Sequence, residues 1–137
     1  MPYEFEEPPL IEPDPESDEL ARAVIGAAIE VHRQFGPGLD EGLYRNALCV
    51  ELNLRRIPFQ KEVVIDVVYK GEPIGKKRID FIVGGKLVVE LNAVEQLAPL
   101  HKAQLLTYLK LMKHKLGLLI NFNTEVLKQG IKRVVRS

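Results

Sequence analysis

The chain has 137 residues, of which 46% are hydrophobic and 28% charged, and its formal net charge is zero. A chain of this length and composition can bury one hydrophobic core, so we expect a single globular domain, and no apolar run approaches the roughly 20 residues of a membrane span. The single cysteine, Cys49, excludes an internal disulfide and any metal centre built from cysteines, and we expect it in the core rather than as a reactive thiol.

The net charge of zero combines an acidic N-terminal segment with a basic body. Residues 1–19 contain eight acidic residues and no lysine or arginine, which leaves 11 acidic and 19 basic residues, a charge of +8, in residues 20–137. Such a body attracts polyanions, of which nucleic acid is the commonest, although a solvated basic surface would have the same composition. We interpret residues 1–16 as a disordered, proline-rich acidic tail and residues 17–137 as the domain. The tail lacks the basic start and apolar stretch of a secretory signal, which predicts a cytoplasmic protein.

Two helices are predicted first. Ser17 can cap a helix in which apolar residues recur at helical spacing until Gly36-Pro37-Gly38. A second helix is expected over residues 40–55. Its apolar positions predict an inward stripe made of Leu43, Ala47, Val50 and Leu54.

Three strands follow, because the hydrophobic period changes to two near residue 61. KEVVIDVVYK (61–70) alternates as a strand does, and the next residues, Lys70-Gly71-Glu72-Pro73, are typical of a turn. KKRIDFIV (76–83) and KLVVELNA (86–93) form a hairpin across Gly84-Gly85.

The rest of the chain contains two more helices, one of them short, and two further strands. Pro99 opens a helix whose inward positions are Leu105, Leu106, Leu109 and Met112. LGLLINF (116–122) is a continuous apolar run typical of a strand buried on both faces, and residues 124–137 fit a short helix, a glycine stop and a final strand. This succession predicts an α/β sandwich with the sheet in the middle.

Two registers are possible for the hairpin. A two-residue turn would mix charged and apolar residues on both of its faces. A three-residue loop, residues 84–86, pairs position 81 with 89 and leaves one face fully apolar, so we favour it. In that register Asp80 lies opposite Glu90, with Cβ atoms roughly 4.5–5.5 Å apart.

Two ionised carboxylates at such a distance repel each other unless a cation lies between them or one takes up a proton. A hard divalent ion suits oxygen ligands, so Asp80 and Glu90 are candidate ligands of Mg²⁺ or Mn²⁺. The alternative is a surface salt-bridge cluster in which Arg78, on the same face, neutralises Asp80.

Several of these residues also resemble known motifs. Asp80, then Glu90-Leu91-Asn92, then Gln104-Leu-Leu-Thr-Tyr108 resemble the motifs of the PD-(D/E)XK nuclease superfamily, including its QxxxY helix motif. Residues 38–44, GLDEGLY, are similar to the GxxExxY signature of one branch of small bacterial proteins in that superfamily. The resemblance extends over residues 18–135 and implies a restriction-endonuclease-like fold, a central mixed sheet flanked by helices.

The resemblance also implies roles for individual residues. Asp80, Glu90 and Glu41 would hold Mg²⁺ or Mn²⁺ in an enzyme that cleaves DNA or RNA. Gln104 and Tyr108, four residues apart on one helical face, would position the substrate backbone or the catalytic groups. His101 lies one turn before Gln104. His32, beside the Gly-Pro-Gly turn, could approach the same cleft or serve as a local hydrogen-bonding partner.

The chain departs from the family pattern at Asn92, where the third motif ends in lysine. The lysine helps to activate water and adds positive charge, and losing such a group typically costs on the order of a hundredfold in rate. Three explanations are open. The first is a degenerate nuclease, and the second is that Lys102, Lys110 or Arg78 supplies the missing cation. The third is that the lysine was replaced deliberately to trap substrate. We therefore predict a metal-dependent nuclease, with Asn92 as a reason for impaired activity. The alternatives are a non-catalytic nucleic-acid-binding module and a structural or regulatory interaction protein.

Overall fold

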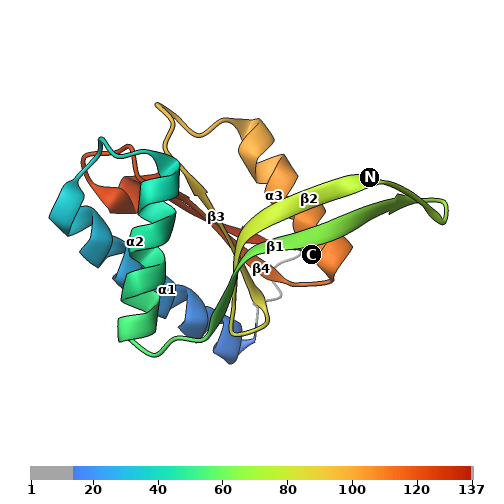
Figure 1. Ribbon diagram of the computed structural model, residues 1–137, viewed down its shortest axis with the longest axis horizontal. Coiled ribbons are helices and arrows are strands. Elements are labelled where there is room, and N and C mark those ends of the chain that lie inside the picture. Colours follow the sequence, from blue (N-terminus) through green and yellow to red (C-terminus); the bar gives the residue numbers. More distant parts are fainter. Residues whose placement is uncertain (1–13, 137) are drawn as a thin grey trace.

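A computed structural model describes residues 14–136 of the chain (Figure 1). The predicted disordered tail lies outside the described residues, except for its last three positions. The elements are, in order, α1 (Pro15–Phe35), α2 (Glu41–Leu54), β1 (Phe59–Tyr69), β2 (Glu72–Val83), β3 (Leu87–Asn92), α3 (Pro99–Met112), β4 (Leu116–Asn121), the 3-10 helix η1 (Leu127–Gly130) and β5 (Ile131–Val135). This order confirms the predicted succession of helices and strands. Within the described part of the chain, no helix is both long and apolar enough to cross a membrane.

The five strands form one mixed sheet in the order β1-β2-β3-β4-β5. Neighbouring strands are antiparallel except β3 and β4, which are parallel because α3 carries the chain back between them. Helices α1 and α2 cover one face of the sheet and α3 covers the other (Figure 1). The fold is therefore the predicted α/β sandwich with the sheet in the middle.

Each face of the sheet has its own hydrophobic core. Along β3, Leu87, Val89 and Leu91 face α1 and α2, whereas Val88 faces α3. All residues of β4 are buried, as its unbroken apolar run predicts. Helix α3 packs closely on this strand, since a Cβ atom at Gly117 would lie 2.9 Å from Cδ2 of Leu105.

Helix α1 begins two residues before the predicted domain boundary. Its N-cap is Asp14, whose Oδ1 accepts a hydrogen bond from the backbone N–H of Ser17 at 2.8 Å. The prediction that Ser17 caps the helix is therefore wrong. Pro15 at the first helical position favours the earlier start, because its fixed φ suits the first turn and it has no N–H to satisfy.

The predicted inward stripe of α2 is also wrong. Leu43, Val50 and Leu54 are 50%, 60% and 72% exposed, and the helix instead buries Tyr44, Leu48, Cys49 and Leu52. The ring of Tyr44 stacks on Phe122 with centroids 4.4 Å apart, and this aromatic contact accompanies the rotation of the helix away from the predicted face. Cys49 lies in the core, as expected.

The hairpin between β2 and β3 adopts the favoured register. Phe81 pairs with Val89 and Val83 with Leu87, and Lys86 N–H closes the loop on the Val83 carbonyl at 3.2 Å. The ladder ends at Phe81, however, and does not continue to a pair between positions 80 and 90. Ile79 consequently packs in the α3-side core rather than beside Phe81, so the alternation of β2 is broken at Asp80.

Strands β1 and β2 extend beyond the body of the molecule as a two-stranded ribbon (Figure 1). We call residues 64–78 the β-arm. Residues 72–78 are exposed without interruption, and the two strands of the arm are linked by an ion pair between Asp66 and Lys76. The end of the ribbon that joins the body leads directly into Asp80.

Candidate active site

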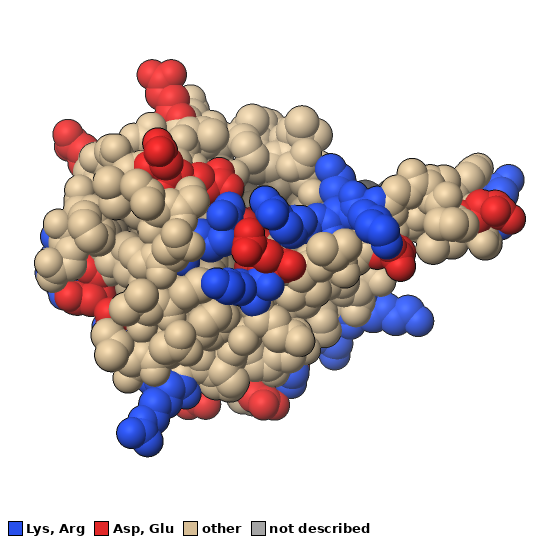
Figure 2. Space-filling model, viewed as in Figure 1, with Lys and Arg blue, Asp and Glu red and all other residues tan. Residues whose placement is uncertain are grey.

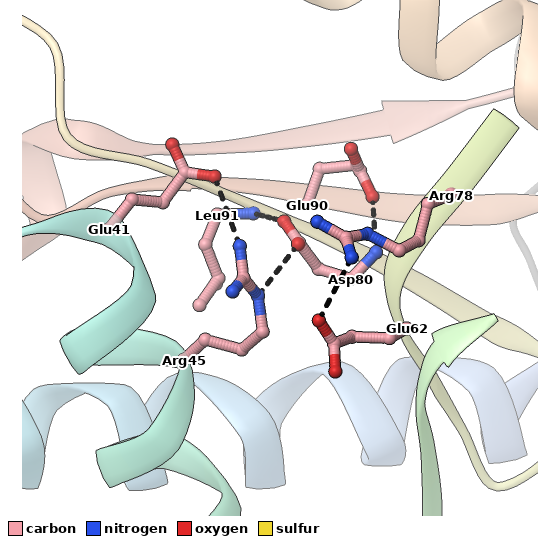
Figure 3. Close-up of polar contacts among 7 residues, drawn as sticks. All are labelled: Glu41, Arg45, Glu62, Arg78, Asp80, Glu90 and Leu91. Carbon is pink, nitrogen blue, oxygen red and sulfur yellow. Dashed lines mark hydrogen bonds and ion pairs between the residues drawn. The ribbon is translucent and has the colours of Figure 1, made fainter.

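Acidic side chains from three elements come together where β2 and β3 separate (Figure 3). Glu41 is the first residue of α2, Asp80 lies in β2 and Glu90 lies in β3. The structure therefore brings together all three residues that the resemblance suggests as metal ligands.

Glu41 is positioned by the loop that precedes α2. The hydroxyl of Tyr44 donates a hydrogen bond to the carbonyl of Gly36 and accepts one from the backbone N–H of Leu39 at 3.1 Å. Tyr44 is fully buried and thereby anchors both the Gly-Pro-Gly turn and the first turn of the helix. Tyr44 thus fixes the loop from which α2 begins with Glu41.

Asp80 and Glu90 each bind the backbone of the opposite strand. Oε2 of Glu90 accepts a hydrogen bond from the backbone N–H of Asp80, and Oδ2 of Asp80 accepts one from the backbone N–H of Leu91, both at 2.8 Å. The two carboxylates accept hydrogen bonds from backbone N–H groups near the point where the regular β-ladder ends, so they link the two separating strands. The two acids therefore lie near each other, but the direct pair between positions 80 and 90 that the register predicted does not form.

A fourth residue, Arg45, connects two of the acids. Its Nε donates to Oδ1 of Asp80 at 3.0 Å, and its Nη2 lies 3.4 Å from Oε2 of Glu41 (Figure 3). Arg78, which would neutralise Asp80 in the alternative interpretation, instead lies 3.3 Å from Glu62. The sequence reasoning missed Arg45, although its position four residues after Glu41 on a predicted helix was a usable signal.

Burial changes the titration of the acids. Desolvation, followed by the charge of Asp80, raises the pKa of Glu90 to about 8, although the N–H of Asp80 opposes this rise. Desolvation and then Asp80 also raise the pKa of Glu41, and Arg45 partly offsets the effect. The pKa of the Tyr108 hydroxyl is raised by burial and then by the charges of Glu90 and Asp80, which places α3 within the field of the same cluster.

The side chains of the cluster are of the type that binds a divalent cation, but they are not arranged around one. Three carboxylates supply the oxygen ligands that Mg²⁺ and Mn²⁺ prefer, and a bound cation would favour the ionised form of Glu90, which burial disfavours. Within residues 14–136, however, no three or more histidine, cysteine, aspartate or glutamate side chains are arranged to hold a metal ion. The donor types fit the ion, and the side chains would have to rearrange to hold it.

Asn92 ends β3 two residues beyond Glu90. Its side-chain nitrogen is buried and lacks a hydrogen-bond acceptor within the structure. A buried amide N–H without a partner is unfavourable by about 1–3 kcal/mol, so the position is suited to an oxygen supplied by a ligand. An amide N–H can bind a phosphate oxygen, but it adds no positive charge.

The remaining predicted residues lie on α3 or α1. Gln104 is exposed and Tyr108 is buried, so only the tyrosine is packed toward the sheet. His101 accepts a hydrogen bond from the backbone N–H of Ala98 and thereby caps α3. His32 Nε2 lies 2.7 Å from the Thr124 carbonyl oxygen, which makes it a local hydrogen-bonding partner.

Two lysines of α3 were candidates for the missing cation. Lys102 and Lys110 are both exposed. In the described part of the chain, no hydrogen bond or ion pair joins either of them to Asp80, Glu90 or Glu41. The basic side chain that reaches the acids is Arg45.

Comparison with known proteins gives two matches. A family model described as the PD-(D/E)XK nuclease superfamily matches residues 18–134. The crystal structure of SSO0001 is similar in fold, with a TM-score of 0.54 and 20% sequence identity over 88% of this chain. The chain spans 58% of the length of that protein. No curated protein sequence matches the chain.

The two matches agree with the architecture. The family model covers α1 through β5 almost completely, including all three acids, Asn92 and the helix that carries Gln104 and Tyr108. A mixed five-stranded sheet between helices is consistent with a restriction-endonuclease-like fold. The chain belongs to the PD-(D/E)XK nuclease superfamily.

Proposed function

We propose that the protein is a nuclease-type phosphodiesterase that acts on nucleic acid and depends on Mg²⁺ or Mn²⁺. The observation that carries this proposal is the convergence of Asp80, Glu90 and Glu41 in a chain of the PD-(D/E)XK nuclease superfamily. The similarity of residues 38–44 to the GxxExxY signature supports the narrower assignment to that branch.

The proposed roles follow from where the side chains lie. Asp80, Glu90 and Glu41 would hold the ion, which when bound would polarise the phosphodiester and make a water molecule more acidic. Asn92 has a buried N–H that lacks an acceptor, and it would donate to a phosphate oxygen. The Tyr108 hydroxyl, whose pKa is raised by burial and by Glu90, would serve as a hydrogen-bond donor, and exposed Gln104 would contact the substrate backbone.

The surface beside the acids supports a polyanionic substrate. Lys76, Lys77 and Arg78 are consecutive exposed basic residues of the β-arm, and they lead along β2 to Asp80. Figure 2 shows blue lysine and arginine side chains on both sides of the red acidic group near the base of the arm. Basic groups that flank an acidic centre can hold phosphates on both sides of the bond to be cleaved.

Cleavage assays on single- and double-stranded DNA and RNA, with Mn²⁺, Mg²⁺ or EDTA, test the proposal. We expect weak metal-dependent cleavage that is abolished by Asp80→Ala. Asn92→Lys should raise the rate by about a hundredfold, because it returns a cation next to the scissile phosphate. If the wild type and both variants neither cut nor bind any of the four substrates, the proposal is wrong.

A second candidate is a non-catalytic nucleic-acid-binding module on the same fold. The observation that favours it is the Arg45–Asp80 ion pair, which neutralises an acid that the proposed enzyme would need for its metal. Binding of nucleic acid with the same affinity in EDTA and in Mn²⁺, and no cleavage by Asn92→Lys, would support this module instead of the nuclease.

A further inference from the structure

Arg45 differs from the other arginine that pairs with a glutamate along α2. The side chains of Arg45 and Asp80 are 16% and 11% exposed, whereas those of Arg55, the C-cap residue of α2, and Glu51 are 40% and 20% exposed. Water screens the first pair less, so its electrostatic attraction is stronger. Arg45 is thus a largely buried cation within the acidic cluster.

We propose that Arg45 is an internal counter-ion that competes with the metal ion for Asp80 and thereby limits the metal affinity of the site. This inference rests on the proposed function, because it takes Asp80 and Glu41 to be metal ligands. It adds a residue from α2 that none of the family motifs identified in the sequence contains.

The contacts of Asp80 explain why the two cations compete. Oδ2 is occupied by the backbone N–H of Leu91, which lies in β3, and Oδ1 is occupied by Nε of Arg45. An ion that bound Oδ2 would share that oxygen with the backbone N–H of Leu91. An ion that bound Oδ1 would meet the guanidinium, and two positive charges within a few ångströms repel each other strongly at a poorly hydrated position.

Arg45 can leave Asp80 without disrupting the core. Its second contact is with Glu41, whose side chain is 43% exposed, so the guanidinium can move toward solvent on that side. In the absence of metal, the same guanidinium stabilises two acids that would otherwise face each other with no counter-charge. The chain therefore carries a replaceable positive charge in the cluster.

Manganese titration of the full-length protein, followed by the electron paramagnetic resonance of free Mn²⁺, tests the inference. Arg45→Gln should bind Mn²⁺ about tenfold or more tightly than the wild type, because a charge-assisted hydrogen bond no longer has to be broken. Arg45→Lys, which keeps the charge but loses the planar guanidinium, should give a smaller increase. Arg55→Gln is the matched control, since it removes an i,i+4 ion pair at the C-terminal end of α2 and should leave the affinity unchanged.

The outcomes separate this inference from the proposed function. Equal or weaker Mn²⁺ binding by Arg45→Gln would overturn the competition, while the metal site itself would stand. If the wild type and all the variants fail to bind Mn²⁺, the proposed metal dependence is wrong and the inference falls with it. Circular dichroism shows whether Arg45→Gln is folded, and if it is not, unchanged affinity in Arg45→Lys overturns the inference.

Discussion

The protonation of Glu90 is part of the charge balance of the site. It lies in β3 within hydrogen-bonding distance of the N–H of Asp80, and its pKa is raised to about 8 by desolvation and then by Asp80. At neutral pH the metal-free cluster therefore contains the positive charge of Arg45 and a Glu90 carboxyl that is mostly protonated. One proton and one guanidinium together balance charges that a divalent ion would otherwise balance.

This shift predicts how stability depends on pH. In the unfolded chain Glu90 ionises near 4.5, whereas in the folded chain it ionises near 8, so between these values the folded state binds more protons. Stability contributed by the protonated carboxyl is complete below the unfolded pKa and is lost as pH rises toward 8. The slope is at most about 1.4 kcal/mol per pH unit.

Glu90→Gln removes this titration. In EDTA, we expect the melting temperature of the wild type to fall from about pH 5 to about pH 8 more steeply than that of the variant. Replacement of the exposed Glu125 by glutamine is the control and should leave the slope as in the wild type. Parallel melting curves for the wild type and Glu90→Gln would show that Glu90 ionises alike in the folded and unfolded states.

At the scale of the elements, the β-arm is an exposed ribbon formed by β1 and β2. It projects from the body (Figure 1), its residues 72–78 are exposed, and apolar Val64 and Ile74 are 57% and 65% exposed. A two-stranded ribbon has the dimensions to enter a major groove or to lie along a phosphate backbone. The arm therefore extends the basic surface away from the acids.

Replacing both Lys76 and Lys77 by glutamate tests the arm. If these lysines contact phosphates, affinity should fall equally for nucleic acids of every sequence. The magnitude of the slope of log affinity against log salt should also decrease by about two. Fluorescence anisotropy over a range of salt concentrations measures both quantities. Lys128 and Lys132, exposed in η1 and β5, form the matched control pair, and an equal loss from their replacement would show that only net charge matters.

At the scale of the whole molecule, charge is divided along the chain. The protein has no net charge, yet residues 14–137 carry +4 and residues 20–137 carry +8. Because electrostatic attraction acts over about 8–10 Å in physiological salt, acidic residues near the basic face weaken attraction to a polyanion. Lys86 already pairs with two of these acids, Asp14 and Glu16.

Deletion of residues 1–13 changes the net charge from 0 to +4. We expect faster association with nucleic acid and higher affinity at low salt, with the difference shrinking as salt is raised. Stopped-flow binding measures the association rate. A version in which the four glutamates of this segment are replaced by glutamine should behave as the deletion does, and no change in either variant would contradict the electrostatic account.

The amino-acid pattern alone determined the order of the elements and the register of the central hairpin. Gly84 and Gly85 adopt positive φ, and a one-residue slip would have exposed the apolar positions 81, 83, 87 and 89, so the local sequence permits one pairing. The sequence also determined that β4 is a buried strand, because its continuous apolar run has the length of a strand. Asp80 and Glu90 were identified as candidates from the hairpin register and a motif, Glu41 from the motif alone, and their roles stay predictions.

Only the tertiary structure decided which side of α2 faces the core and which cation reaches the acids. The helix has two apolar stripes, and Tyr44, stacked on Phe122 from a distant part of the chain, lies on the one that is buried. That rotation directs Arg45 toward Asp80 while leaving Leu43 and Val50 exposed. Helical periodicity specifies which residues share a face, but the orientation of that face depends on contacts between elements that sequence spacing does not contain.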